Sequence, residues 1–392
     1  MKVVVTASHT GQPERNDMVT TLATSTQTHN LDIDIDAQRD ALMDHLFQAT
    51  CRVWEIYGVY IGDQLGLYRA LGASGPTTSV ALAAGQGLAE RYVREWLEQQ
   101  TVAGILTVEN PDEPPLERRF SLPAGHREVL TETDSLNYLA PLAQIIVGAV
   151  APIHAVLDAF RTGEGVAYAD YGADLREGQA GMNRNLPLHQ LGQEYLPAIP
   201  DIHARLIADP PARVADIGCG VGWSSIGIAQ SYPNVRVDGF DLDEASVDEA
   251  RGHVHTAGVA DRVDIQLRDA ADPALAGTYD LVTAFECIHD MADPVGALRT
   301  MRGLAGDNGA VLVMDERVED HFTAAGTDIE RFVYGFSVLH CLPVGLADQP
   351  SAGTGTVMRP ATLRRYAQEA GFRDIEILPL DNVFFTFYRL IA

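Results

Sequence analysis

The stretch Val214-Ala-Asp-Ile-Gly-Cys-Gly-Val-Gly-Trp223 decides the fold of this 392-residue chain. A short apolar strand runs into Gly218, Gly220 and Gly222, and glycine lets a backbone turn sharply and approach a ligand because it has no Cβ. A dinucleotide fingerprint needs GxGxxG with a pyrophosphate at the following helix, and Trp223 stands where its third glycine would be. The stretch therefore predicts a strand, a tight loop and a helix around a ligand without a pyrophosphate, which disfavours an NAD-dependent oxidoreductase.

From Arg213 to the C-terminus, strand-like and helix-like segments alternate. The expected strands are VADIG (214–218), VRVDGFDL (235–242), VDIQLRD (263–269), YDLVTAF (279–285), AVLVMDE (310–316), IEILPL (375–380) and NVFFTFYRL (382–390). Strands that alternate with helices form a parallel sheet covered on both faces. We therefore expect an α/β fold, a Rossmann-like doubly wound sheet of seven strands with an antiparallel last strand.

The N-terminal half has a different character and divides into three parts. Residues 1–35 are polar and are expected to form a flexible arm. Residues 36–133 read as helices followed by two short strands, which is a winged-helix pattern. Residues 134–200 read as helices broken by glycines and are expected to bridge to the sheet domain, residues 201–392. A winged-helix-like domain here would serve dimerisation or cover the substrate.

The charge balance bears on possible partners. The chain has 28 Lys+Arg against 54 Asp+Glu, a formal net charge of −26, so nucleic acid and anionic membrane surfaces are disfavoured. The candidate recognition helix, Leu88–Gln100, carries two arginines against three glutamates, whereas a DNA-reading helix should be basic. The acidic excess, with Lys2 as the sole lysine, fits either a salt-rich cytoplasm or a high-GC coding bias.

The cysteines and the apolar runs of the sequence indicate the cellular compartment in which the protein is expected. Cys51, Cys219, Cys287 and Cys341 are far apart and show no metal-ligand spacing, so neither a structural zinc nor a disulfide framework is expected. The longest apolar stretch, residues 136–157, is interrupted by prolines and polar residues and is not expected to span a membrane. We expect a cytoplasmic protein with reduced thiols.

Carboxylates follow the next two strands of the predicted sheet. Asp241 ends the second strand, where a carboxylate can accept both ribose hydroxyls of an adenosine and would repel a 2′-phosphate. Asp269 ends the third strand, where it can accept a hydrogen bond from an adenine amino group. Together with the glycine loop at the same edge of the sheet, they predict an adenosine-containing ligand.

Residues 213–316 resemble the core of class I S-adenosylmethionine-dependent methyltransferases. VADIGCGVG matches the first motif of that family, DGFDLD its ribose-binding strand end, RDAAD its adenine-side motif and YDLVTAFECIHD its fourth strand. LAERYVREWLEQQTVAGIL followed by FSLP is similar to the winged-helix dimerisation domain of small-molecule methyltransferases. The resemblance implies an enzyme that uses S-adenosylmethionine, acts on a small molecule and forms a homodimer.

The resemblance also implies which residues hold the cofactor. Asp216, Gly218 and Gly220 would line the methionine end, Asp241 would hold the ribose, and Asp269 and Ala270 would flank the adenine. The other predicted cofactor-binding residues are Gly222, Leu242, Phe285 and Glu286.

The acceptor side centres on His289. Methyltransferases with a winged-helix front domain carry a similar His-Asp pair followed by Trp, and that histidine is their general base. Here Met291 replaces the Trp. An imidazole can take the proton of a hydroxyl or thiol, and Asp315 or Glu316 could orient it. The alternative is that His289 only caps its loop. Asp315 and Glu316 could instead hold a divalent metal, but no third ligand is evident, so no metal is predicted.

Four further residues are weaker acceptor-side candidates. Tyr168 and Tyr171 would either close over the donor or pack in the core. His340, in an apolar helix, would either roof the pocket or be a core histidine. Arg184 would meet an acidic acceptor, the donor carboxylate or a surface carboxylate.

We expect O-methylation of a small molecule with His289 as general base. Methylation at carbon, sulfur or nitrogen is the nearest alternative, because a reactive methyl donor needs alignment more than a conspicuous catalytic motif. A non-catalytic winged-helix regulator that senses S-adenosylmethionine is a further alternative.

Overall fold

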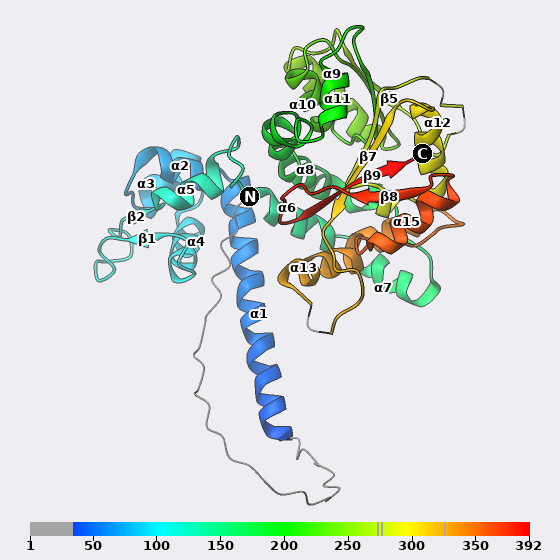
Figure 1. Cartoon of the computed structure of the whole chain (residues 1–392). Coiled ribbons are helices and arrows are strands. Elements are labelled where there is room, and N and C mark those ends of the chain that lie inside the picture. Colours follow the sequence, from blue (N-terminus) through cyan, green and yellow to red (C-terminus); the bar gives the residue numbers. More distant parts are fainter. Residues whose placement is uncertain (1–33, 273, 276, 325) are drawn as a thin grey trace, which may run out of the picture.

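The computed structural model describes residues 34–272, 274–275, 277–324 and 326–392. The predicted arm, residues 1–35, falls almost wholly outside these ranges. A small helical lobe and a larger sheet domain stand side by side, and a long helix runs from between them away from both (Figure 1).

The larger domain is built on a seven-stranded sheet of order β5-β4-β3-β6-β7-β9-β8. The strands are β3 (Arg213–Ile217), β4 (Arg236–Asp241), β5 (Val263–Leu267), β6 (Leu281–Phe285), β7 (Ala310–Glu316), β8 (Asp374–Ile377) and β9 (Phe385–Ile391). β9 is antiparallel to both of its neighbours, and the other pairings are parallel. The predicted fold class is confirmed, including the antiparallel last strand, which inserts between β7 and β8.

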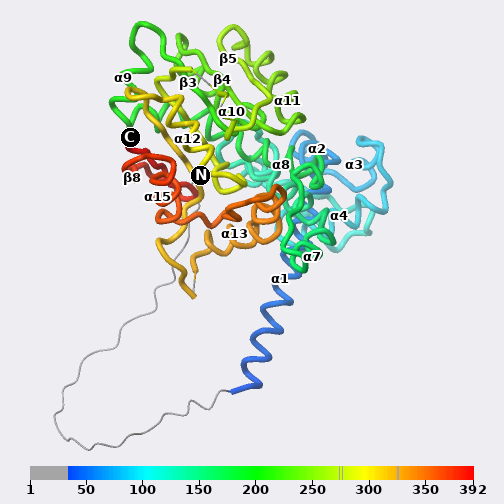
Figure 2. Tube along the Cα trace, turned by 90° about the vertical axis from the view of Figure 1, so that its right-hand side faces the viewer, coloured from blue at the N-terminus to red at the C-terminus, as the bar shows by residue number. Residues whose placement is uncertain are grey.

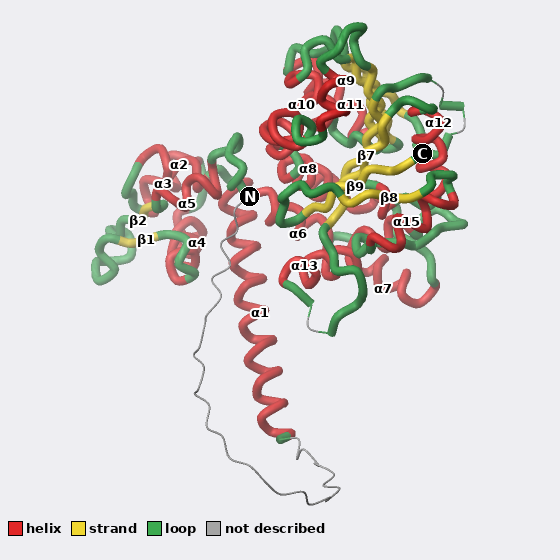
Figure 3. Tube along the Cα trace, in the orientation of Figure 1, coloured by secondary structure: helices red, strands yellow, loops and turns green. Residues whose placement is uncertain are grey.

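Helices cover both faces of the sheet, which explains why its central strands are almost entirely apolar. One face packs against η2 (Pro187–Tyr195), α9 (Pro200–Leu206), α10 (Trp223–Ser231) and α11 (Glu244–Thr256). The other packs against α12 (Pro294–Ala305) and α15 (Pro360–Glu369). The yellow strands lie between these two groups of helices (Figure 3).

The small lobe has the winged-helix arrangement. Its elements are α2 (Leu67–Ser74), α3 (Ser79–Gln86), α4 (Glu90–Val102), β1 (Thr107–Val108), β2 (Phe120–Ser121) and α5 (Ala124–Thr131). The two short strands pair antiparallel. The lobe has its own apolar core, in which Leu97, Trp96 and Phe120 are buried.

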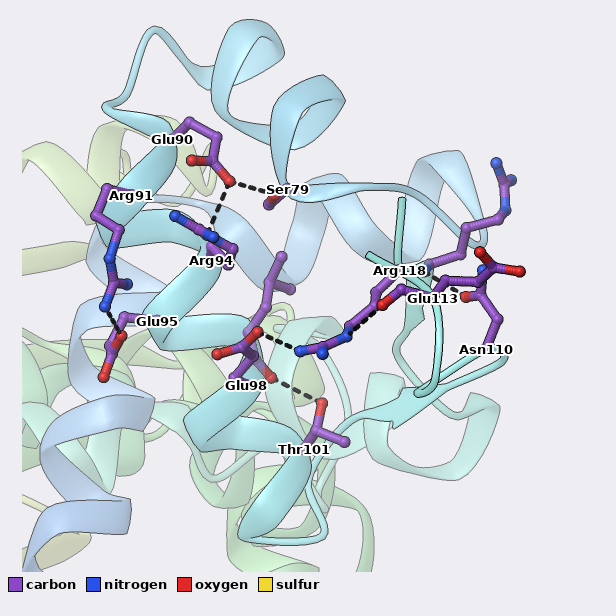
Figure 4. A network of polar contacts seen from close by, with 12 residues as sticks. Ser79, Glu90, Arg91, Arg94, Glu95, Glu98, Thr101, Asn110, Glu113 and Arg118 are labelled. Carbon is purple, nitrogen blue, oxygen red and sulfur yellow. Dashed lines mark hydrogen bonds and ion pairs between the residues drawn. The ribbon is translucent and has the colours of Figure 1, made fainter. Parts of the chain in front are cut away.

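The polar face of α4 is electrically balanced. Arg91 pairs with Glu95, and Arg94 lies 3.2 Å from Glu90. Glu98 binds Arg118, which comes from the loop between β1 and β2, at 2.7 Å (Figure 4). The arginines of this helix are therefore neutralised by neighbouring glutamates, and the helix does not present the basic surface that a DNA-reading helix uses.

The helix α1 (Ile35–Gln64) has two contrasting halves. Its C-terminal turns pack on the small lobe, where Trp96 donates a hydrogen bond to the carbonyl of Gly58 at 2.8 Å. Its N-terminal half projects away from the rest of the chain (Figures 1 and 2). The exposed large apolar side chains of this half are Ile35, Leu42, Met43, Leu46 and Phe47, and Val53 and Trp54 follow further along the helix.

The bridging segment and a late helical segment complete the structure. They comprise α6 (Ala140–Val150), α7 (Ile153–Thr162), η1 (Tyr168–Tyr171), α8 (Gly172–Met182), α13 (Asp328–Phe336), η4 (Ser337–Cys341) and α14 (Leu342–Gly345). α6 and α8 approach closely, since a Cβ on Gly148 would lie 2.3 Å from the backbone nitrogen of Leu175. In the described residues no single helix is long and apolar enough to cross a membrane, although α6 and α7 together, bent by 53°, would meet that criterion by length and composition.

Asp216 connects three elements of the sheet domain. Its buried carboxylate accepts hydrogen bonds from Ser224 at 2.6 Å and Ser225 at 2.7 Å, both on α10, and from Thr283 on β6 at 2.7 Å. Burial raises the pKa of Asp216, while these three hydroxyls act in the opposite direction. The carboxylate thus joins β3, β6 and the first turn of α10 directly beneath the glycine loop.

The first prediction concerns this carboxylate. Asp216→Ala leaves three buried hydroxyls without their acceptor, so we expect the free energy of unfolding to fall by about 3 kcal/mol. Urea denaturation followed by circular dichroism measures it. The matched control is Asp264→Ala, an exposed aspartate on β5, which should change stability by less than about 0.5 kcal/mol. Equal free energies of unfolding for the two variants would contradict the role of Asp216 as the acceptor for three buried hydroxyls.

Candidate active site

A cavity of about 690 Å³ lies at the carboxyl ends of β3, β4, β5 and β6. This is the edge at which open α/β sheets bind ligands. The sheet side contributes Gly218, Gly220, Asp241, Leu242, Asp269, Ala270, Phe285 and Glu286, all predicted cofactor residues. The opposite wall comes from η1, α8, η2 and α14 with the residues just after it. The bridging segment therefore covers the glycine loop.

The glycine loop leaves bare backbone along the cavity. Gly218, Gly220 and Gly222 have φ values of +64°, +52° and +84°, a region that favours glycine. A Cβ on Gly218 would lie 2.7 Å from the sulfur of Cys287, whereas a Cβ on Gly220 would meet no protein atom within 4 Å. The space beside Gly220 is thus free for a ligand, as a closely bound adenosyl cofactor requires.

The Asp241 carboxylate holds the backbone of the site and can also bind a ligand. Its Oδ2 accepts the Gly220 N–H at 2.7 Å, and its Oδ1 accepts the Asp243 N–H at 2.9 Å. Each carboxylate oxygen has a second lone pair, so the side chain can still accept two ribose hydroxyls. Burial raises the pKa of Asp241, although the backbone N–H groups favour its charged form. The residues fit an adenosyl group at this position.

The predicted adenine-side residues, Asp269 and Ala270, follow β5 and line the cavity. Leu242, directly after β4, lines it as well. Oδ1 of Asp269 also accepts the Ala271 N–H at 2.9 Å, which fixes the turn.

Trp223, the residue that interrupts the dinucleotide pattern, stacks on His253 with ring centres 4.1 Å apart.

One face of α8 contributes a wall that the sequence analysis missed. Arg176, Gln179 and Ala180 on this helix, and Asn183 directly after it, line the cavity. Their spacing of three, four and seven residues from Arg176 puts them on one helical face. This spacing was a signal in the sequence, but the direction of the face depends on the packing of α8 against α6. Tyr168, a predicted residue, lines the same wall and bonds Gln179 at 3.0 Å.

Glu286 stands at the end of β6 in an unusual conformation. Its φ of +55° is the one positive value among the non-glycine residues that the structure describes. Its backbone N–H donates to the carbonyl of Met314 at 2.8 Å, which holds that conformation. Burial and the nearby Asp315 carboxylate raise the pKa of Glu286 to about 7, although His289 and a hydrogen bond with Asn183 act in the opposite direction.

His289 lies in η3 (Ile288–Asp290) and is only 2% exposed. Its Nδ1 is 2.8 Å from Asp315 and 3.3 Å from Glu316, while its Nε2 is 3.2 Å from Asp290. Burial by itself lowers the pKa of His289, but these three carboxylates raise it well above its ordinary value. The structure therefore brings the predicted triad together, and His289 is not among the residues that line the cavity.

The other predicted residues lie away from the wall. Asp216 is buried beneath the glycine loop, and Gly222 is the loop glycine that does not line the cavity. Tyr171 is buried and donates a hydrogen bond to the carbonyl of Leu339 at 2.8 Å. His340 is fully buried against Tyr171, with ring centres 4.8 Å apart, and burial lowers its pKa to about 4. Arg184 forms an ion pair of 2.6 Å with the exposed Asp134, which is the surface-pair alternative.

Two groups of ligand-type atoms share His289. One consists of His289, Asp315 and Glu316, and the other of His289, Asp290 and Cys341, each within 4.8 Å. The close contacts of His289 already account for the three acidic side chains around it, and we assign no metal.

Two family models match this chain. A methyltransferase domain matches residues 188–377. A winged HTH domain described as Rv2258c-like matches residues 57–132. The first range contains the glycine loop and all four strand ends that border the cavity, and the second contains the small helical lobe.

Curated relatives match half of this chain or less in the two examples that follow. A ubiquinone biosynthesis O-methyltransferase from Azoarcus sp. is 27% identical over 197 residues, which are 49% of this chain and 75% of the relative. The polyketide synthase ThaQ from Burkholderia thailandensis is 33% identical over 104 residues, which are 26% of this chain and 5% of that protein. The chain thus spans only a small part of the polyketide synthase.

Solved structures share the whole architecture. The mitomycin 7-O-methyltransferase MmcR has a TM-score of 0.67 at 19% identity and covers 91% of this chain and 99% of its own. Human N-acetylserotonin methyltransferase, solved with its S-adenosylmethionine cofactor, has a TM-score of 0.67 at 17% identity, with 90% and 98% covered. At such identities the likeness shows the fold. Together with the family models, it makes this chain a class I S-adenosylmethionine-dependent methyltransferase with an N-terminal winged-helix domain.

The second prediction concerns the ribose carboxylate. Asp241→Ala removes a charged acceptor for two hydroxyls, each bond being worth about 1.5–3 kcal/mol. We expect the affinity for S-adenosylhomocysteine, measured by calorimetry, to fall at least about tenfold. Asp264→Ala is again the control, because Asp264 is exposed on β5 and should leave binding unchanged. Unaltered affinity in the Asp241 variant would remove the ribose assignment.

Proposed function

We propose that this methyltransferase transfers the methyl group of S-adenosylmethionine to a hydroxyl oxygen of a small molecule. The observation that carries the proposal is a cavity that joins the adenosyl-binding strand ends to a carboxylate–imidazole cluster, here named the acidic cluster: Glu286, Asp290, His289, Asp315 and Glu316. A hydroxyl acceptor must lose a proton as the methyl group arrives, and such a cluster can take it.

The chain's own residues hold and shield the cofactor. The bound cofactor supplies an electrophilic methyl group on a sulfonium. Asp241 orients the ribose, the glycine loop approaches the rest of the ligand closely, and α8 with η1 closes the opposite side. This wall excludes water and fixes the direction of approach, which is how alignment lowers the barrier.

His289 contributes the positive charge of the acidic cluster. Its imidazolium offsets the charge of the carboxylates around it and fixes their positions. The proton of the acceptor would enter this cluster through a carboxylate on the cavity wall, because the ring of His289 itself is enclosed.

The experiment that tests the function has two steps. Calorimetric titration with S-adenosylhomocysteine, with NAD as control, should give binding of the first compound only. Incubation with S-[methyl-¹⁴C]adenosylmethionine and pools of hydroxyl, amine and thiol compounds should then label the hydroxyl pools. Binding of NAD alone would contradict the cofactor, and label confined to amines or thiols would contradict O-methylation.

The projecting half of α1 supports a homodimer. Leu42, Met43, Leu46 and Phe47 lie on adjacent turns and are each more than half exposed. Apolar side chains at this helical spacing form a stripe that needs a partner surface. The matched winged HTH domain lies directly against this helix. We assign the stripe to a second copy of this chain.

The third prediction follows from this stripe. The double variant Leu46→Glu, Phe47→Glu places charges where two apolar surfaces would meet, so sedimentation should change from dimer to monomer. Gln48→Glu, one residue further on the same exposed helix, is the control and should remain dimeric. A monomeric parent protein, or a dimeric double variant, would contradict the interface.

A further inference from the structure

The C-terminal turns of α1 are fixed to the small lobe along one face. Gly58 and Gly62, one turn apart, meet the lobe so closely that a side chain has no room. A Cβ on Gly58 would collide with the side-chain amide of Gln100, and a Cβ on Gly62 would collide with the ring of Trp96. Trp96 also donates a hydrogen bond to the carbonyl of Gly58 at 2.8 Å. This part of α1 and the small lobe therefore form one close-packed unit.

Tyr60 lies on the opposite face of α1. It stands midway between Gly58 and Gly62 in the sequence, and two positions correspond to about 200° around a helix. Its hydroxyl lies 3.0 Å from each carboxylate oxygen of Asp174 on α8. Burial and the hydrogen bond to Asp174 raise the pKa of Tyr60, so its hydroxyl keeps its proton and donates at neutral pH.

Asp174 belongs to a polar contact that joins α1, α6 and α8. The side-chain amide of Gln144 on α6 donates to Asp174 at 3.2 Å and to Glu177 at 3.1 Å. Gln144 is only 8% exposed, and a buried amide with two hydrogen bonds holds both of its partners in place. The link from α1 to α8 is therefore braced from α6.

The glycines between α6 and α8 fix the distance between these helices. Gly148 on α6 lies against the backbone of α8, and a Cβ on Gly178 of α8 would lie 2.7 Å from the backbone nitrogen of Ile145. Such a contact brings two backbones together without interlocking side chains. The hydrogen bonds at Asp174 are directional, so they can set the rotation of α8 about its own axis, which the glycine contact does not.

The rotation of α8 determines which side chains face the cavity. Arg176, Gln179 and Asn183 line the wall opposite the glycine loop. The Nε of Arg176 is buried and makes no hydrogen bond among the described residues, and Glu249 on α11 lies 3.7 Å from it. Asp174 lies two positions before Arg176 on the same helix, so a contact that fixes Asp174 also fixes the direction of this face.

We propose that Tyr60 positions the cofactor-binding wall, because its hydrogen bond to Asp174 sets the rotation of α8. Tyr60 is not among the residues that line the cavity, so it is a positioning residue that acts through Asp174. The small lobe, fixed to the other face of α1, thereby takes part in binding S-adenosylmethionine. The inference rests on the cofactor of the proposed function, and it holds whichever atom accepts the methyl group.

The test measures the affinity for S-adenosylhomocysteine by calorimetry. Tyr60→Phe removes the donor and keeps the ring, so the affinity should fall at least about fivefold, the lower end of typical couplings between sites. Asp174→Ala should have a similar effect. Asp174→Asn keeps an acceptor oxygen for Tyr60 and should stay within about twofold of the parent. The matched control is Tyr92→Phe, because Tyr92 is 82% exposed on α4 and should leave the affinity unchanged.

Two further measurements separate positioning from a general loss of stability. The midpoint of thermal unfolding should fall by less than about 4 °C in Tyr60→Phe. Hydrogen exchange of the ligand-free variant should become faster in residues 173–182 of α8 and stay unchanged in β3. Saturating S-adenosylhomocysteine should reduce this difference from the parent, because the bound compound holds the same wall.

A double variant tests whether the two groups act as one contact. Tyr60→Phe combined with Asp174→Ala should lose less affinity than the product of the two single losses. Fully independent losses, unchanged affinity in Tyr60→Phe, or equal exchange of α8 in this variant and the parent would each overturn the proposal. Failure of the parent to bind S-adenosylhomocysteine would instead contradict the proposed function, and the exchange of α8 in the ligand-free protein would still test the contact.

Discussion

The architecture of the site depends on a buried carboxylate. Asp216 receives hydrogen bonds from two hydroxyls at the start of α10 and one on β6, and so it determines how the chain leaves β3. The glycine loop can then follow a backbone path with positive φ at three positions. In turn, the loop N–H of Gly220 holds Asp241 at the end of β4. The binding edge is therefore one connected set of polar contacts and not four independent strand ends.

The same edge concentrates negative charge around one imidazole. Three acidic side chains lie within 3.3 Å of His289, and they raise the pKa of its ring. Glu286 and Asp290 of the acidic cluster line the cavity, whereas His289 lies beneath its wall.

The helix α1 serves a different part of the molecule. Its C-terminal turns belong to the small lobe, but its projecting half carries an apolar stripe without a partner in the described chain. Helical periodicity by itself predicts amphipathic helices, and it does not say whether the apolar side meets the same chain or another one. In the three-dimensional structure, the stripe lies on the part of α1 that projects away from the rest of the chain.

The sequence by itself determined the sheet, its seven strands, the two domain types and the cofactor class, because strand periodicity and the glycine spacing are local signals. It also placed Asp241, Asp269 and Glu286 at the binding edge, since carboxyl ends of parallel strands share one side of a sheet. Only the tertiary structure decided that Arg176, Gln179 and Asn183 face the cavity, that His340 is a core residue and that His289 is enclosed. These outcomes depend on how α8 and η4 pack over the sheet, and packing between segments far apart in the chain leaves no local pattern in the sequence.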